Sequence, residues 1–364
     1  MNDAQPLKSI RVIDFTTLLP GPLATLFLAR AGAEVIKVEP PTGDPMRSLL
    51  KDDGVTFELL NQGKKSISVD LKDEGNQRRI QQLCRSADVV IEQFRPGVMG
   101  RLNLDYEMLK VQNPDLVYAA LTGYGQTGEL ASVAGHDINY IAESGLFDLL
   151  RNQHREPVPP PILLADIVGG AWPACLNILL ALVKRSVSGS GSYVDISMIR
   201  GLQSLAFWAV PQAKDRVQPP QRHPELGGGL ARYQIYRCAD DRWLALGALE
   251  EKFWQRFCEL AQVPGEFRRN ERSQDEVKVA VSQIISSKSL CHWQDIFADE
   301  DVCCNQVRSL VDVLADLVAS SVESGQDTFP LPLPIAPQME SDAVTLISTE
   351  LGHYNAEFDL PDLS

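Results

Sequence analysis

The sequence contains no run of eighteen apolar residues, which is about the length that a membrane-spanning helix needs. Its N-terminus begins with polar residues and passes directly into a strand-like run at residues 10–15, without the apolar stretch of a secretory signal peptide. The C-terminal tripeptide Asp-Leu-Ser is not a peroxisomal signal. We therefore expect a soluble protein with no membrane partner.

Cysteine motifs are also missing. The seven cysteines are an odd number, they are scattered, and they include no C-x-x-C pair and no histidine at ligand spacing. This pattern argues against a disulfide framework or a structural zinc site and is typical of a protein in the reducing cytoplasm. We interpret the adjacent Cys303 and Cys304 as ordinary cysteines, and we expect no metal.

Basic residues are scarce. The chain has 34 Lys and Arg against 48 Asp and Glu, so its net charge is -14. Long-range repulsion would weaken binding to nucleic acid or to anionic membranes, so neither is expected as a partner. No G-x-G-x-x-G follows the first predicted strand, which argues against a nicotinamide or flavin dinucleotide.

Short apolar runs alternate with helical patterns in the first half of the chain. Residues 10–15 predict a strand, 23–31 a helix and 33–38 a second strand, an order that implies a parallel sheet. Further strands are predicted at 88–91, 116–121 and 193–198, with a helix at 106–112 and a long apolar helix from Gly169. The fold class predicted for this part is α/β, with a doubly wound, Rossmann-like parallel sheet.

The composition changes after a polar, proline-bearing segment at residues 212–226. Two strand-like runs joined at Ala239-Asp240-Asp241 predict a hairpin, and three helical patterns follow it at 251–261, 275–286 and 290–297. We predict a large domain at 1–196, a linker at 197–224, a smaller α+β domain at 225–320, and a C-terminal connector at 321–364 that returns to the large domain.

Two ionisable side chains stand at predicted helix starts. His136 and Asp166 each follow a turn-like or apolar segment, so backbone N–H groups are expected beside both. Each residue could equally serve only to cap its helix. An acid and a base beside anion-receptive backbone nevertheless indicate catalysis, with the N–H groups at Asp166 as candidate donors to an enolate oxygen.

The chain resembles the class III CoA-transferase family and, within it, the α-methylacyl-CoA racemases. The resemblance rests on motifs along nearly the whole chain, among them Asp14-Phe15-Thr16, Pro20-Gly21-Pro22, Phe94-Arg95-Pro96-Gly97, Ala134-Gly135-His136-Asp137 and Ala165-Asp166. It implies an acyl-CoA thioester substrate, no cofactor beyond its coenzyme A, and an interlocked homodimer with a large and a small domain.

The resemblance also implies roles for individual residues. His136 and Asp166 match the proton-transferring pair of the racemases, and Glu250 matches an acidic residue that orients the histidine. Basic residues in loops after strands would hold the CoA phosphates, and we place Arg47, Lys64, Lys65, Lys72, Arg95 and Arg101 in such loops. Relatives often carry an arginine where this chain has Pro40, and Arg47 is expected to replace it. The expected CoA contacts are Arg47, Val69, Asp70, Leu71, Lys72, Gln93, Phe94, Arg95, Arg101, Thr122, Gly123, Tyr124 and Gly125.

Two other functions stay open at this point. In a CoA-transferase Asp166 would be a nucleophile that forms an aspartyl-CoA thioester, and no second base would be needed. Some transferases of the family have a glutamine where Leu19 stands here and no match to His136, whereas Gly227-Gly228-Gly229 is similar to a mobile transferase loop. A protein that binds CoA thioesters without turnover is the third possibility.

Overall fold

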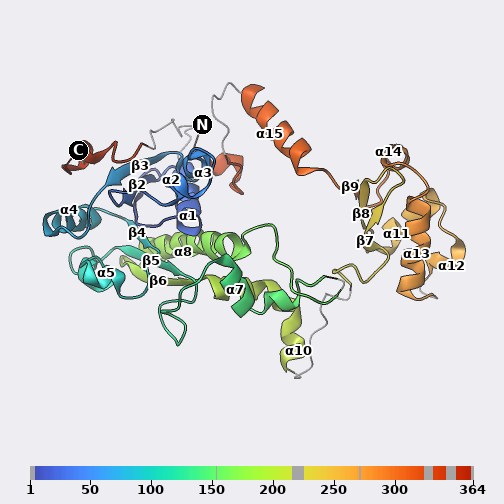
Figure 1. Cartoon of the computed structure of the whole chain (residues 1–364), viewed down its shortest axis with the longest axis horizontal. Helices are drawn as coiled ribbons and strands as arrows, with labels where there is room; N and C mark the ends of the chain where they lie inside the picture. Colours follow the sequence, from blue (N-terminus) through green and yellow to red (C-terminus); the bar gives the residue numbers. More distant parts are fainter. Residues whose placement is uncertain are drawn as a thin grey trace. The chain divides into compact units, whose positions relative to one another are not determined.

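We describe the protein from a computed structural model, in which residues 5–152, 154–214, 225–269, 272–323, 331–341 and 350–361 are placed well enough to describe. The chain divides into two compact units, Met1–Phe207 with Pro330–Ser364, and Trp208–Phe329 (Figure 1). We call them the large unit and the small unit and describe each by itself.

The large unit is built on a six-stranded parallel sheet in the order β3-β2-β1-β4-β5-β6. The strands are β1 (Arg11–Asp14), β2 (Glu34–Glu39), β3 (Lys64–Ser68), β4 (Val89–Glu92), β5 (Val117–Thr122) and β6 (Ser192–Ser197). The order reverses between β1 and β4, and in such sheets ligands bind outside the carboxyl ends of the strands at this point. The sheet confirms the predicted α/β fold.

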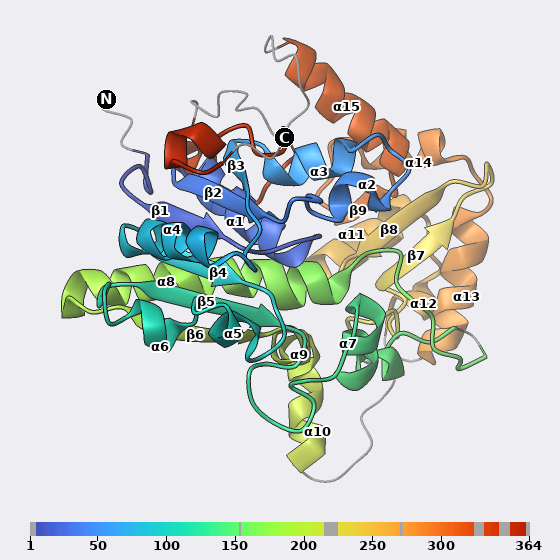
Figure 2. The ribbon, with the colours of Figure 1, turned by 60° about the vertical axis from the view of Figure 1, so that its left-hand side comes forward.

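Helices pack on both faces of this sheet (Figures 1 and 2). Strand residues such as Val35 and Val117 share one core with α1 (Pro20–Arg30), α2 (Met46–Leu49), α3 (Val55–Asn61) and α8 (Trp172–Ser188). Alternate residues such as Ile36 and Tyr118 share a second core with α4 (Glu74–Arg85), α5 (Val98–Arg101) and α6 (Tyr106–Leu109). Because both faces of the sheet are covered, the central strands β4 and β5 are apolar along nearly their whole length. The helix predicted at 106–112 is the shorter α6.

Strand β3 corrects one expectation from the sequence. Lys64 and Lys65 do not lie in a loop after a strand but open β3 itself. Lys64 is buried, and its ammonium group lies 3.5 Å from Asp14 and donates hydrogen bonds to Asn61 and to the carbonyl of Pro22. Burial lowers the pKa of Lys64 to about 7. These partners hold Lys64 inside the large unit, so it is unsuited to binding a phosphate.

Helix α8 carries apolar side chains on the face that packs on the sheet and also on the opposite face. Together with the preceding turns, residues 165–188 are long and apolar enough to span a membrane, a property that the core helix of a globular domain also shows. Ala174, Ile178 and Ala181 face the sheet and are buried. The opposite face carries Trp172, Leu176, Leu180, Val183 and Val187, all between 44% and 86% exposed. We call these five residues the outer face of α8.

The remaining elements of the large unit include short helices around the carboxyl ends of the strands. They are α7 (Asp137–Glu143), η1 (Leu146–Asp148), the π-helical η2 (Ala165–Ala171) and α9 (Met198–Gln203), which is followed by η3 (Ser204–Ala209). The short η4 (Pro337–Met339) lies instead near the last residue of α1, where Glu340 pairs with Arg30. Helix α10 (Val210–Lys214) follows η3 in the small unit. The first half of the predicted linker at 197–224 is therefore helical, and residues 215–224 lie outside the described part of the chain.

The small unit combines an antiparallel sheet with helices. The predicted hairpin is present as β7 (Tyr233–Arg237) and β8 (Trp243–Gly247), and the short strand β9 (Cys304–Gln306) pairs with β8. Trp254, Phe257, Trp293 and Phe297 stack in its core. The helices are α11 (Glu251–Leu260), α12 (Gly265–Arg268), α13 (Gln274–Ile285), α14 (Leu290–Phe297) and α15 (Leu310–Glu323).

The end of the chain packs on the edge strand of the large sheet. The side-chain amide of Asn355, which begins η5 (Asn355–Phe358), accepts a hydrogen bond from the N–H of Ser68 (2.8 Å) and donates one to its carbonyl (3.1 Å). The N–H of Tyr354 donates to the carbonyl of Ser66. Asn355 thus takes the place of a neighbouring peptide group along β3.

Candidate active site

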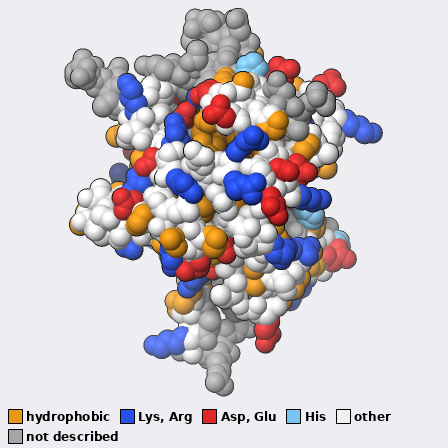
Figure 3. All heavy atoms as spheres, turned by 90° about the vertical axis from the view of Figure 1, so that its left-hand side faces the viewer, with side chains coloured by type: hydrophobic (Ala, Val, Ile, Leu, Met, Phe, Trp, Pro, Cys, Tyr) orange, Lys and Arg blue, Asp and Glu red, His pale blue; other side chains and the backbone are white. Residues whose placement is uncertain are grey.

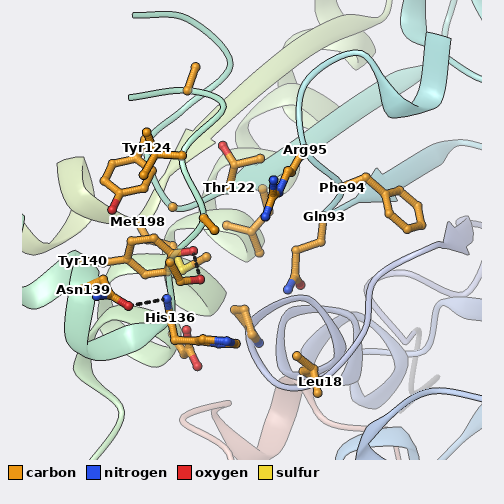
Figure 4. Close-up of a pocket in the computed structure, with 18 of the residues that line it drawn as sticks. Leu18, Gln93, Phe94, Arg95, Thr122, Tyr124, His136, Asn139, Tyr140 and Met198 are labelled. Atoms are coloured by element: carbon orange, nitrogen blue, oxygen red, sulfur yellow. Dashed lines mark hydrogen bonds between the residues drawn. The ribbon is translucent and has the colours of Figure 1, made fainter. Parts of the chain in front are cut away.

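A cavity of about 480 Å³ opens at the carboxyl ends of β1, β4 and β5, next to the point where the strand order reverses (Figure 4). Three loops that follow these strands supply most of its wall, and α7, η2 and α9 supply the rest. Its lining residues are Thr17, Leu18, Pro20, Gln93, Phe94, Arg95, Pro96, Leu121, Thr122, Gly123, Tyr124, Ala131, Val133, Ala134, Gly135, His136, Asn139, Tyr140, Asp166 and Met198.

His136 and Asp166 line this one cavity from different elements. His136 immediately precedes α7, where its backbone N–H donates to the Asn139 side chain (3.0 Å), and its imidazole points into the cavity (Figure 4). Asp166 lies in the first turn of η2, and Leu164 occupies the cap position instead. The structure therefore brings the expected acid–base pair together, while the catalytic roles stay a prediction.

Asp137 connects the two segments and was assigned no role from the sequence. Its Oδ1 accepts hydrogen bonds from the backbone N–H groups of Ala165 (2.7 Å) and Asp166 (3.0 Å). The expectation that these N–H groups would stabilise an enolate is therefore wrong, because a buried carboxylate already occupies them. In the described part of the chain, the N–H groups of Asp137 and Ile138 at the start of α7 donate no hydrogen bond.

The surroundings of Asp166 raise the pKa of its carboxyl. Burial raises the pKa of its carboxyl to about 7, and the nearby charge of Asp137 adds to the shift. Burial also raises the pKa of Asp137, although two backbone N–H groups stabilise its ionised form. A group with a pKa near 7 can release and accept a proton with similar ease, as a general acid or base requires.

The loop after β4 presents a mixed set of side chains. The N–H of Gly21 donates to Gln93 Oε1 (3.1 Å), so the amide nitrogen of Gln93 remains for the cavity (Figure 4). Arg95 is exposed at the wall of the cavity, whereas the ring of Phe94 points away and packs against the second core. Buried Glu92 holds this loop by accepting the N–H of Phe94 (2.7 Å).

Two glycines make room for an aromatic wall that sequence reasoning missed. A Cβ on Gly123 would lie 2.0 Å from the ring of Tyr140, and one on Gly135 would lie 2.7 Å from it. The Tyr140 hydroxyl donates to the carbonyl of Gly135 (2.6 Å), and its ring packs edge-on against Tyr124. The only sequence signal for Tyr140 was its place in the run that follows His136.

Several residues expected to contact CoA do not line the cavity. Val69, Asp70, Leu71 and Lys72 directly follow β3, two strands away from β1, and Gly125 and Arg101 also lie outside the lining. On the face that carries α4 and α5, basic and acidic side chains are interspersed (Figure 3). The CoA contacts of these residues stay predictions.

Arg47 and Glu250 have structural partners of their own. Arg47 forms two hydrogen bonds with Glu39 (2.8 Å each), and its guanidinium lies 3.7 Å from the ring centroid of Phe57. Contact with CoA would compete with this pair. Glu250 is the N-cap residue of α11 in the small unit, and its expected action on His136 stays a prediction.

Within the described residues, no group of three or more His, Cys, Asp or Glu side chains is placed to hold a metal ion. The seven cysteines are free thiols. Function without metal, nicotinamide or flavin, and a cytoplasmic location, remain expectations from the sequence.

A parallel α/β sheet with His136 and Asp166 in a cavity at its switch point is an arrangement typical of α/β enzymes. Residues 7–328 match the family model "CoA-transferase family III". The chain therefore belongs to CoA-transferase family III.

Relatives with both chemistries are similar to this chain. Human α-methylacyl-CoA racemase is 31% identical over 349 residues, which cover 90% of this chain and 86% of the relative. Acetyl-CoA:oxalate CoA-transferase of Acetobacter aceti is 33% identical over 312 residues, which cover 80% and 78%. A crystal structure of a hypothetical protein from Mycobacterium tuberculosis superposes with a TM-score of 0.83 and 28% identity, covering 98% of this chain and 100% of that one. The protein is thus an enzyme of the family III transferase and racemase superfamily.

Proposed function

We propose that this enzyme epimerises the α-carbon of 2-methylacyl-CoA thioesters by two-base proton transfer. The observation that carries the proposal is that His136 and Asp166 line one cavity from separate elements. Burial, which raises the pKa of the Asp166 carboxyl to about 7, supports it. Epimerisation needs two groups on opposite sides of one carbon, one of which is protonated while the other is not.

In the proposed reaction one of the two side chains removes the α-proton, and the electrons move into the thioester carbonyl to give an enolate. The other side chain then delivers a proton to the opposite face of the same carbon. One proton leaves and one arrives, so the two epimers differ only at this centre. Hydrogen bonds to the enolate oxygen lower the barrier, by roughly 3 to 4 kcal/mol for a well-placed donor, and the unused N–H groups that begin α7 are candidates.

The charges around the cavity favour an uncharged acyl group. Among the described lining residues, Arg95 is the one permanent cation, and it is expected to bind a CoA phosphate. A dicarboxylate that accepted CoA would bring a further negative charge close to Asp166 and Asp137. Leu18, Pro20, Met198 and Tyr140 offer an apolar wall to a 2-methyl branch instead.

The second candidate is CoA transfer between carboxylic acids. Asp166 would then attack the thioester and carry the acyl group and CoA in turn, and the relative from Acetobacter aceti has a transferase name. The side chain that reaches the cavity is Leu18, whereas Leu19 is not among the lining residues and packs against the core. The absence of a glutamine at position 19 therefore distinguishes a racemase from a transferase less well than the presence of His136.

We further propose that the enzyme is a homodimer. The outer face of α8 is a continuous apolar stripe at helical spacing, and burying such a stripe against a second copy is favourable by about 25 cal/mol per Å². The family resemblance independently implies a homodimer, one with interlocked subunits. Contact with the apolar interior of a membrane is the alternative way to bury this face.

The decisive experiment incubates (2R)-2-methylacyl-CoA with the protein in deuterated water. Formation of the 2S epimer with α-deuterium is expected, and His136→Ala and Asp166→Ala should each abolish epimerisation while retaining some exchange from one epimer. A parallel assay follows CoA movement to free acids. Transfer that survives in His136→Ala, together with an Asp166 thioester trapped by hydroxylamine, would replace epimerisation with CoA transfer.

A further inference from the structure

Leu18 adopts a backbone conformation that leucine rarely takes. Its φ is +63°, in the left-handed region where a Cβ lies too close to the following carbonyl. Seven other non-glycine residues in the described part of the chain have positive φ, and none of these seven lines the cavity. Strain of this kind persists only where the surrounding structure fixes it, and it clusters at functional sites.

A buried ion pair holds Leu18 in this conformation. The N–H of Leu18 donates to Asp44 Oδ1 (3.1 Å), and Asp44 Oδ2 lies 2.8 Å from Lys37 Nζ. Lys37 also donates to the carbonyl of Thr16 (2.8 Å). Asp44 and Lys37 are each 1% exposed and Thr16 is fully buried, so the loop is fixed from inside the large unit.

The side chain of Leu18 reaches the cavity as a result. It lines the same cavity as His136 and Asp166, and Figure 4 shows it beside the space into which the imidazole of His136 points. A substrate carbon placed between the two acid–base groups would therefore carry its substituents against an aliphatic wall. The volume left by that wall decides how large a branch fits.

We propose that Leu18 is the residue that limits the 2-alkyl branch of the acyl group to methyl, and that Asp44, paired with Lys37, is a positioning residue that holds Leu18 against the branch. The proposal rests on the proposed function, because it takes a 2-branched acyl-CoA as the ligand. It adds a determinant of substrate size that is separate from the acid–base pair.

The first test compares Leu18→Ala and Leu18→Gly with the wild type. Dissociation constants are measured for 2-methylacyl-CoA and 2-ethylacyl-CoA, and the selectivity ratio is the preference for methyl over ethyl. Because one methylene in an apolar pocket is worth about 10- to 200-fold, this ratio should fall at least about tenfold in both variants. An unchanged ratio in both would overturn the role of Leu18.

Thermal unfolding separates the side chain from the backbone. Glycine adopts positive φ without strain, so Leu18→Gly should melt roughly 2 to 4 °C above Leu18→Ala, while the two share the changed selectivity ratio. Asp53→Gly is the matched control, since Asp53 has a φ of +53° outside the cavity. Its selectivity ratio should equal that of the wild type.

The second test isolates the acceptor atom on residue 44. The double variants K37M/D44N and K37M/D44A both lack the ion pair, but only the first keeps an oxygen for the N–H of Leu18. K37M/D44N should retain the wild-type selectivity ratio, and K37M/D44A should lose it as Leu18→Ala does. K37M/D44S, whose hydroxyl is too short to reach Leu18, serves in its place if K37M/D44A does not fold. Equal ratios in the variants with and without the acceptor would overturn the role of Asp44.

These binding measurements do not depend on turnover. A wild-type protein that binds both thioesters but exchanges no α-proton would refute the proposed epimerisation, and the selectivity ratio would still decide the role of Leu18. A wild-type protein that binds neither thioester would overturn both proposals.

Discussion

Asp137 accepts a hydrogen bond from the backbone N–H of Asp166, and this contact ties the segment that begins at His136 to the segment that contains Asp166. Asp137→Asn keeps the accepting oxygen but removes a negative charge near Asp166, so the pKa of Asp166 should fall. Asp137→Ala removes the hydrogen bonds as well and should lower the free energy of unfolding by about 1 kcal/mol. The pH dependence of α-deuterium exchange and thermal unfolding measure the two effects. If the acidic limb of the exchange profile does not shift in Asp137→Asn, the expected fall in the pKa of Asp166 is contradicted.

The pH profile of activity should report Asp166 directly. In a two-base reaction the pair must hold one proton in total, so kcat/KM should be bell-shaped, with one limb near pH 7 from Asp166. The profile should have the same shape from either epimer, because the ratio of the two kcat/KM values equals the pH-independent equilibrium constant. A nucleophilic Asp166 predicts a different result, namely a rate that rises through pH 7 and then stays level.

Asp166 should also lower stability at alkaline pH. Burial raises the pKa of its carboxyl from the ordinary 3.8 to about 7 in the folded protein, so the folded protein favours the protonated form. The stability that this preference contributes is complete below pH 4 and is lost as the pH rises through 7. Asp166→Asn should therefore be more stable than the wild type at pH 8, by about 2 kcal/mol after allowance for solvent screening, and equal to it at pH 4.

Chemical denaturation at pH 4 and pH 8 checks this expectation. Asp53→Asn removes an exposed carboxyl and serves as the control, with equal stability to the wild type at both pH values. A variant Asp166→Asn that is destabilised at pH 8 would show that ionised Asp166 has a favourable partner in the folded protein.

The outer face of α8 makes the proposed dimer testable. Leu180→Glu places a charge in the middle of this face, and dissociation to monomers in sedimentation velocity is expected. Val111→Glu, at a residue that is 76% exposed on the loop after α6, is the control and should leave the dimer intact. A wild-type protein that sediments as a monomer and floats with lipid vesicles would assign the face to a membrane.

The sequence predicted five of the six strands of the large sheet within one or two residues. Four of them are short apolar runs between polar residues, and the fifth, β6, alternates as a strand does. Strand β3 was missed because it begins with Lys64 and Lys65, and the buried Asp14 that accommodates Lys64 is fifty residues away in the chain. Strand β9, with the sequence Cys-Asn-Gln, has no apolar run to reveal it.

In the site, too, residues within local sequence motifs could be predicted, whereas features that depend on tertiary contacts could not. His136 and Asp166 were found because each stands in a recognisable run, and the parallel topology brings both to one edge of the sheet. The hydrogen bonds of Asp137 to a segment about thirty residues later, and the left-handed backbone of Leu18, depend on tertiary partners that no local pattern records. For this reason the sequence does not reveal that the N–H groups of Ala165 and Asp166 are already occupied.

The contact between Asn355 and Ser68 also bears on how the chain is made. Ribosomes synthesise proteins from the N-terminus at about 5 to 20 residues per second, so the strand that carries Ser68 waits some tens of seconds for the residue that covers its edge. During that interval the uncovered strand can pair with the same strand of a neighbouring nascent chain. Premature termination before Asn355 would make the exposure permanent, so aggregation in the cell, more than lost activity, is the expected consequence of a stop codon between Ser68 and Asn355 that spares the cavity.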